Sequence, residues 1–177
     1  MIRLDLGCGR RKRQGWTGVD SNPAVGPDVL HSLDVFPYPF QDSSVDEIVM
    51  DNSLEHLDEQ LAVMEELHRI SKPGGLITLH VPYFRSHWAF NDQTHVRFFS
   101  VETFYHYDPA HPYNQLYPYL KARYTVESIR FNERINRGPI RTLTKWLANR
   151  WPERYEDSLS HLIPLDELTF RLRVLKS

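Results

Sequence analysis

Short apolar runs, each followed by turn-forming or polar residues, fill the first part of the chain. Residues 1–6 and 17–20 predict two buried strands, and residues 28–33 and 45–50 predict a third and a fourth. Only eleven residues lie between the first strand and Gly18. Because a parallel crossover that includes a helix needs at least about ten to twelve residues, we expect the first helix to be stunted or missing.

A helical pattern follows this strand-rich region. Asp58 is suited to cap the helix at its N-terminus, and Pro73-Gly74-Gly75 is suited to end it. Residues 76–81 are again apolar and predict a fifth strand. Strands that alternate with a helix indicate a doubly wound α/β fold with a mostly parallel sheet. The apolar positions of the helix, all expected in the core, are Leu61, Met64, Leu67 and Ile70.

The stretch 83–119 differs from the rest of the chain, because aromatic, histidine and proline residues crowd it with little periodicity. A short helix capped by Ser100 is expected there, through Val101, Phe104 and Tyr107, and the remainder is expected to be loop. A loop this long in a compact domain is usually functional or mobile. We therefore expect the substrate to bind at this stretch.

Regular patterns return in the last third of the chain. Residues 125–132 predict a sixth strand, and residues 140–151 predict a helix with one apolar face. Residues 168–174 alternate between apolar and polar side chains and predict a final strand. A chain of 177 residues is large enough to bury a core of its own, so we expect a single domain over residues 1–177.

Composition excludes several classes of protein. The formal net charge of −2 gives no electrostatic footprint for nucleic acid. No apolar run approaches the eighteen or so residues of a membrane span, and the chain opens into a strand with no signal-peptide pattern. Cys8 is the only cysteine, so no internal disulfide is possible. A cytoplasmic location is expected.

The first candidate chemistry lies where the first strand ends. Gly7-Cys8-Gly9 allows a sharp turn and a close approach of bare backbone to a ligand. Asp20, at the end of the second strand, is suited to accept hydrogen bonds from ribose hydroxyls. Lys12 stands where the dinucleotide fingerprint has its third glycine. The basic run 10–13 is read as a solvated loop, with anion binding as the alternative.

These motifs resemble those of a known family. Residues 4–9 together with Asp20 look like the first two motifs of class I S-adenosylmethionine-dependent methyltransferases. Residues 36–46 and 69–75 are similar to the later motifs of that family, in order and at similar spacing. The resemblance covers roughly the first eighty residues. It implies a Rossmann-like fold with an antiparallel last strand, S-adenosylmethionine as cofactor, and methyl transfer.

The resemblance also implies where the cofactor binds. Asp34 would accept a hydrogen bond from the adenine amine, although a capping or turn role is the alternative. His56 would contact the methionine part of the cofactor or cap the following helix, and the sequence does not separate these roles. The cofactor-binding residues so implied are Asp5, Gly7, Cys8, Gly9, Asp20, Ser21, Leu33, Asp34, Asn52, Ser53 and His56.

A catalytic base is needed only when the acceptor holds a proton that must leave. A histidine in the loop stretch is suited to this task near neutral pH. His95 is the first candidate and His87 the second, with Asp92 as an orienting carboxylate. A histidine among aromatic residues more often packs or donates a hydrogen bond. The spacing of these three residues matches no defined ligand pattern, so no metal site is predicted.

Three functions compete at this point. Methyl transfer to a small-molecule or glycan-type acceptor is favoured. A dehydrogenase that uses a nicotinamide dinucleotide would also need Gly7, Gly9 and Asp20, but the third glycine is missing. The third alternative is a non-catalytic module that binds the cofactor, or a partner subunit. Cofactor binding without acceptor activity would favour that alternative.

Overall fold

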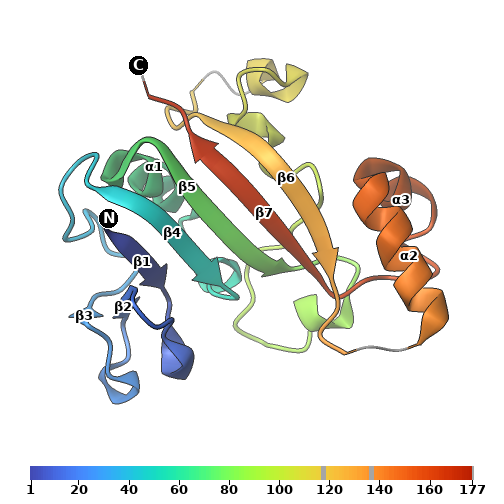
Figure 1. Cartoon of the computed structure of the whole chain (residues 1–177), viewed down its shortest axis with the longest axis horizontal. Helices are drawn as coiled ribbons and strands as arrows, with labels where there is room; N and C mark the ends of the chain where they lie inside the picture. The colour runs from blue at the N-terminus through green and yellow to red at the C-terminus, as the bar shows by residue number, and fades with distance from the viewer. Residues whose placement is uncertain (117–118, 136–137, 177) are drawn as a thin grey trace.

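The computed structural model describes residues 1–116, 119–135 and 138–176, and within these ranges seven strands form one sheet. Their order is β3-β2-β1-β4-β5-β7-β6 (Figure 1). The first five strands pair in parallel, and β7 runs antiparallel to both β5 and β6. This confirms the predicted α/β class and the antiparallel last strand. The strands are β1 (Arg3–Leu6), β2 (Thr17–Asp20), β3 (Val29–Leu30), β4 (Val45–Asp51), β5 (Ser71–Pro82), β6 (Tyr124–Asn132) and β7 (Glu167–Val174).

Few helices accompany the sheet. Figure 1 shows α1 (Gln60–Ile70) behind β4 and β5, whereas α2 (Pro139–Arg150) and α3 (Pro152–Ser158) lie beyond β6. The connection from β1 to β2 contains only a 3₁₀ turn, Gly9–Arg11. The predicted loss of the first helix is therefore confirmed. The short helix α3, which begins at a proline as helices often do, was not predicted. Among the described residues, no helix has the length and apolar character needed to cross a bilayer.

Two of the predicted elements are shorter than expected. The strand predicted over 28–33 is reduced to Val29–Leu30. The helix predicted after Ser100 is a 3₁₀ turn, Tyr105–Tyr107, although the Ser100 hydroxyl does accept a hydrogen bond from the N–H of Glu102. Local signals, namely apolar positions and a capping serine, indicated these elements, and such signals cannot report how far backbone pairing extends. Residues 117 and 118 of the 83–119 stretch lie outside the described residues.

Two predicted helical faces are corrected by the structure. Helix α1 begins after Glu59 and not after Asp58, and Leu61 is 52% exposed rather than in the core. Val63 takes its place beside the other predicted positions. In α2 the apolar positions Ile140 and Leu143 face solvent, and the helix buries Thr144 and Ala148 instead. A folded surface is more than half apolar, so apolar spacing does not by itself identify the buried face.

Several aromatic residues of the 83–119 stretch belong to the core. Tyr83, Phe99 and Phe104 are fully buried, and the ring of Phe104 meets Phe170 of β7 edge-on at 4.8 Å between centroids. This stretch therefore folds back over the sheet and contributes to the core. His95, which precedes Phe99 in this stretch, is left at the edge of the candidate site, where its ring meets that of His56.

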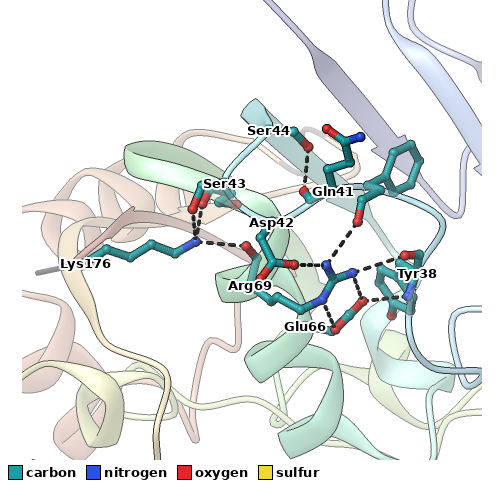
Figure 2. Close-up of polar contacts among 10 residues, drawn as sticks. Tyr38, Gln41, Asp42, Ser43, Ser44, Glu66, Arg69 and Lys176 are labelled. Carbon is teal, nitrogen blue, oxygen red and sulfur yellow. Dashed lines mark hydrogen bonds and ion pairs between the residues drawn. The ribbon is translucent and has the colours of Figure 1, made fainter.

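The two later family-like motifs meet in one polar network (Figure 2). Arg69 at the end of α1 donates from Nε to Glu66 at 2.8 Å and from Nη1 and Nη2 to the carbonyls of Phe40 and Tyr38. The N–H of Tyr38 donates to the same Glu66 carboxylate at 2.5 Å. Lys176 closes the network by donating to the Ser43 hydroxyl at 2.9 Å. These motif residues hold the loop before β4 against α1.

Candidate active site

The glycine loop after β1 adopts a backbone that only glycine tolerates well. Gly7 has a φ of +70°, and its N–H donates to the carbonyl of Val19 in β2 at 2.8 Å. A Cβ at this position would lie 2.5 Å from the Cβ of Ser53. The absence of a side chain therefore lets the ends of β1, β2 and β4 converge.

Asp20 at the end of β2 holds this loop in place. One carboxylate oxygen accepts the N–H of Gly9 at 2.9 Å, and the other accepts the N–H of Asn22 at 2.9 Å. Each oxygen keeps a second lone pair. The carboxylate is thus oriented by the protein and still has acceptor capacity for a ligand.

Two cavities adjoin at Gly7 and Asn52. The first, about 340 Å³ in volume, is called here the cofactor cavity. The second, about 420 Å³, is called the arginine cavity. Every residue predicted to bind the cofactor lines one of the two. The cofactor cavity holds Gly7, Asp20, Ser21, Leu33, Asp34, Asn52, Ser53 and His56, and the arginine cavity holds Asp5, Gly7, Cys8, Gly9 and Asn52.

Polar contacts fix the walls of the cofactor cavity. The Ser53 hydroxyl donates to the carbonyl of Leu6 at 3.1 Å. The carbonyl of Leu33 accepts from the Tyr38 hydroxyl at 2.7 Å. Asp34 accepts the N–H of Asp58 at 3.0 Å, so it also holds the segment that leads into α1. The walls are therefore set by contacts between segments that are distant in sequence.

The arginine cavity combines a buried carboxylate with cationic side chains. Asp5 is buried, it accepts the N–H of Arg13 at 2.9 Å, and burial raises the pKa of its carboxyl. The guanidinium of Arg13 pairs with Asp51 at 3.4 Å. Lys12 turns away to Asp28 at 2.8 Å. The cavity lining also includes Arg10 and Arg11. Three arginines of the basic run thus border the cavity, and the lysine is engaged elsewhere.

Comparison with known proteins decides the class of this site. Residues 4–79 match a family model described as "Methyltransferase domain". These residues form a methyltransferase domain. The resemblance to class I S-adenosylmethionine-dependent methyltransferases is confirmed, and with it the predicted enzyme class and the cofactor S-adenosylmethionine. No curated protein matches the sequence.

Solved structures share the fold of this chain at low sequence identity. An S-adenosylmethionine-dependent methyltransferase from Archaeoglobus fulgidus is 20% identical with a TM-score of 0.60, over 97% of this chain and 86% of that one. A methyltransferase candidate from Haloferax volcanii, in complex with the Trm112 methyltransferase activator, is 18% identical with a TM-score of 0.62, over 99% and 82%. The [4+2]-cyclase SpnF is 15% identical with a TM-score of 0.59, over 99% and 76%. A cyclase among these relatives shows that the fold does not fix the reaction.

The residues predicted for catalysis lie in different settings. The His95 side chain is 8% exposed, and its ring lies 4.7 Å from the ring of His56 between centroids. Asp92 reaches this pair only indirectly, because it accepts a hydrogen bond from the Thr94 hydroxyl, which contacts His56. His87 is exposed and packs on Trp88. The structure brings His95 to the edge of the cofactor cavity and leaves His87 outside it.

Sequence reasoning missed two residues beside the cavities. Glu55 is fully buried, and burial raises the pKa of its carboxyl to about 7. Arg134, after β6, donates from Nη2 to the Asn52 side chain at 2.5 Å and lies over the Trp88 ring at 4.7 Å. Glu55 was recognisable only as the residue before His56. No local pattern in the sequence links Arg134 to β4.

Proposed function

We propose that this methyltransferase transfers the methyl group of S-adenosylmethionine to a small-molecule or glycan-type acceptor bound on the side of the 83–119 stretch. The observation that carries the proposal is the pair of adjoining cavities, whose lining includes every predicted cofactor-binding residue. His95 of the loop stretch meets His56 at the edge of the cofactor cavity. Acceptor-side and cofactor-side residues are therefore in contact.

The residues present fit the cofactor. Asp20 keeps acceptor capacity for ribose hydroxyls, and Asp34 keeps it for an adenine amine. The bare backbone at Gly7 leaves space that a Cβ would fill. When bound, S-adenosylmethionine supplies a methyl group activated by its sulfonium. The protein's task is to orient the acceptor in line with that methyl group and to exclude water.

The acceptor side is supported by a further cavity of about 360 Å³. Arg97, His106 and Tyr107 of the loop stretch contribute to its lining, together with Asp58. The N–H of Asp58 donates to Asp34, which lines the cofactor cavity, so the two cavities neighbour each other. A cavity with ring faces and several polar groups suits a compact polar acceptor. A single domain over residues 1–177, a cytoplasmic location and no nucleic-acid partner remain parts of this proposal.

Titration calorimetry tests the cofactor half of the proposal. The protein is titrated in parallel with S-adenosylmethionine, S-adenosylhomocysteine and NAD, and binding of only the first two is expected. Asp20→Ala should weaken that binding by about 1–3 kcal/mol through lost hydrogen bonds. Binding of NAD alone, or no binding at all, would overturn the assignment.

Transfer of a labelled methyl group tests the acceptor half. The screen uses small hydroxylated and amino compounds and oligosaccharides, with S-adenosylhomocysteine release as the readout. Methylation of one of these classes is expected. Cofactor binding with no transfer to any of them would instead support the non-catalytic or partner-subunit alternative.

A further inference from the structure

Three ligating side chains meet beside the cofactor cavity. Glu55 and His56 lie in the 3₁₀ turn Leu54–His56 after β4, and His95 comes from the loop after β5. One ligand atom from each lies within 4.8 Å of the other two, and His95 Nε2 is 4.0 Å from Glu55 Oε1. The backbone keeps them together, because the Glu55 carbonyl accepts the N–H of Val96 at 2.9 Å. We call Glu55, His56 and His95 the Glu-His-His cluster.

The Glu55 carboxylate is the least expected member of the cluster. Its residue is 0% exposed, and neither side-chain oxygen has a hydrogen-bond partner among the residues that the structure describes. A buried carboxylate without partners is costly unless a cation or a donor satisfies it. The described part of the chain therefore provides no hydrogen-bond partner for the Glu55 carboxylate.

Hydrogen bonds set the tautomers of both histidines. His95 Nδ1 lies 3.1 Å from the carbonyl of Ala89, which can only accept, so Nδ1 carries the proton. His56 Nδ1 lies 2.8 Å from the Thr94 hydroxyl, and that hydroxyl donates to Asp92 at 2.7 Å. The hydroxyl oxygen therefore accepts from His56 Nδ1. In the neutral form of each imidazole, Nε2 is then the nitrogen with the free lone pair, and that nitrogen is the one able to bind a metal.

We propose that the Glu-His-His cluster binds one divalent transition-metal ion of the zinc class. Two imidazole nitrogens and one carboxylate oxygen suit such an ion better than magnesium or calcium, which prefer oxygen ligands. With metal–ligand bonds of about 2.0–2.2 Å, ligand atoms on one ion lie roughly 3–3.5 Å apart, so closing around the ion takes about 1 Å of movement by each side chain. The contacts of His95 with Ala89 and of His56 with Thr94 are the outer contacts that orient ligating histidines.

In this arrangement His95 is a ligand rather than a free base. Three protein ligands leave at least one coordination position open on the ion. His56 also lines the cofactor cavity, so the ion lies beside the site of the methyl donor. An acceptor oxygen on the open position would lose its proton more readily. That last use of the ion rests on the proposed methyl transfer, whereas binding of the ion does not.

Metal binding is tested on the full chain after dialysis against a chelator. Zn²⁺ is titrated in competition with a chromophoric chelator, and Co²⁺ is added separately to record its visible absorption band. One equivalent of Zn²⁺ should bind and should bleach the Co²⁺ band, and millimolar Mg²⁺ should not compete. No stoichiometric binding to the parent protein would overturn the proposal.

Variants separate the cluster from adventitious histidine sites. Glu55→Gln and His95→Gln should each weaken Zn²⁺ binding at least tenfold, whereas His87→Gln, in the same loop, should leave it unchanged. Thr94→Val, which removes only the orienting hydroxyl, should weaken it about 10- to 100-fold. Equal affinity in the parent, Glu55→Gln and His95→Gln would overturn the proposal, because the ion would then lie elsewhere. Calorimetry with S-adenosylmethionine on the same samples reports folding and the cofactor site independently.

Discussion

At the scale of single residues, the proposed cofactor site depends on positions where a side chain has no room. Gly7 combines a φ of +70° with a predicted Cβ contact of 2.5 Å to Ser53. Gly26 has nearly the same φ, +66°, but a Cβ there would meet nothing within 4 Å. A substitution would therefore strain the backbone at both glycines, but only at Gly7 would the new side chain also clash with a neighbour.

Gly7→Ala should lower the affinity for S-adenosylmethionine at least tenfold, about 1.4 kcal/mol, because the loop must move away from Ser53. Gly26→Ala should cost about 1–2 kcal/mol of folding stability through its left-handed backbone and leave the affinity unchanged. Calorimetry and urea unfolding of both variants check this. An equal loss of affinity in the two would contradict the steric explanation.

At the scale of elements, side chains of α1 join segments that the sheet alone does not hold together. Arg69 ties the loop before β4 to the helix end. His68 donates from Nε2 to the carbonyl of Leu175, just after β7, at 2.8 Å. Helix α1 is therefore fixed at both sides by polar contacts, and its buried face packs on the core.

Arg69→Leu should destabilise the protein by about 2–3 kcal/mol, since it leaves the mostly buried Glu66 carboxylate without its guanidinium partner. This loss of folding stability is smaller than for a fully buried ion pair, because the Arg69 side chain is partly exposed and water screens its charge. Arg69→Lys should recover only part of the loss, because an ammonium cannot reach several acceptors as a planar fork does. Urea unfolding measures all three proteins. A loss below about 0.5 kcal/mol in Arg69→Leu would contradict this role.

His68 should make the folding stability decrease as the pH falls below the ordinary histidine pKa of about 6.5. Burial lowers the pKa of His68, and the nearby cations Lys176 and Arg123 lower it further. The hydrogen bond to the Leu175 carbonyl and the charge of Glu65 act in the opposite direction, but the net pKa shift is downward. The folded state then prefers the neutral ring. The contribution of His68 to folding stability is therefore full above about pH 6.5 and is lost as the pH falls through the pKa of the folded state. His68→Gln keeps a donor for Leu175 but does not titrate. The stability advantage of the parent over this variant should shrink as the pH falls below about 6.5 in urea unfolding, and a constant difference would contradict the shift.

At the scale of the whole molecule, large aromatic residues lie both in the core of the sheet and on the outer surface of a helix. Phe170 of β7 is fully buried, whereas Trp146 on the outer face of α2 is 60% exposed. Figure 1 shows α2 beyond β6, away from the strands that carry the cavities. The ring of Phe170 therefore contributes to the core, whereas the ring of Trp146 lies mostly in solvent.

Phe170→Ala should cost about 3–5 kcal/mol of folding stability, because it leaves a cavity in the core. Trp146→Ala should change stability by no more than about 0.5 kcal/mol. Chemical denaturation of the two variants gives the comparison. Similar losses in both would show that the outer face of α2 is covered in solution.

Much of the site was predictable because its signals are local. The apolar run that ends in Gly7, the short link to β2, and Asp20 at the end of that strand each depend on neighbouring residues, and all were predicted. The fold class followed from the alternation of strands and a helix. Glu55 and Arg134 were not found, because nothing near them in sequence reports what they contact.

The sequence by itself determined the order of strands along the chain and the glycine loop after the first strand, since backbone preference and periodicity act over a few residues. Only the tertiary structure decided that His95 meets Glu55 and His56, and that Arg134 reaches Asn52. It also decided that Leu61 and the apolar face of α2 turn to solvent. These contacts depend on which surfaces pack together, and the pattern of residues within one segment does not indicate which other segment will contact it.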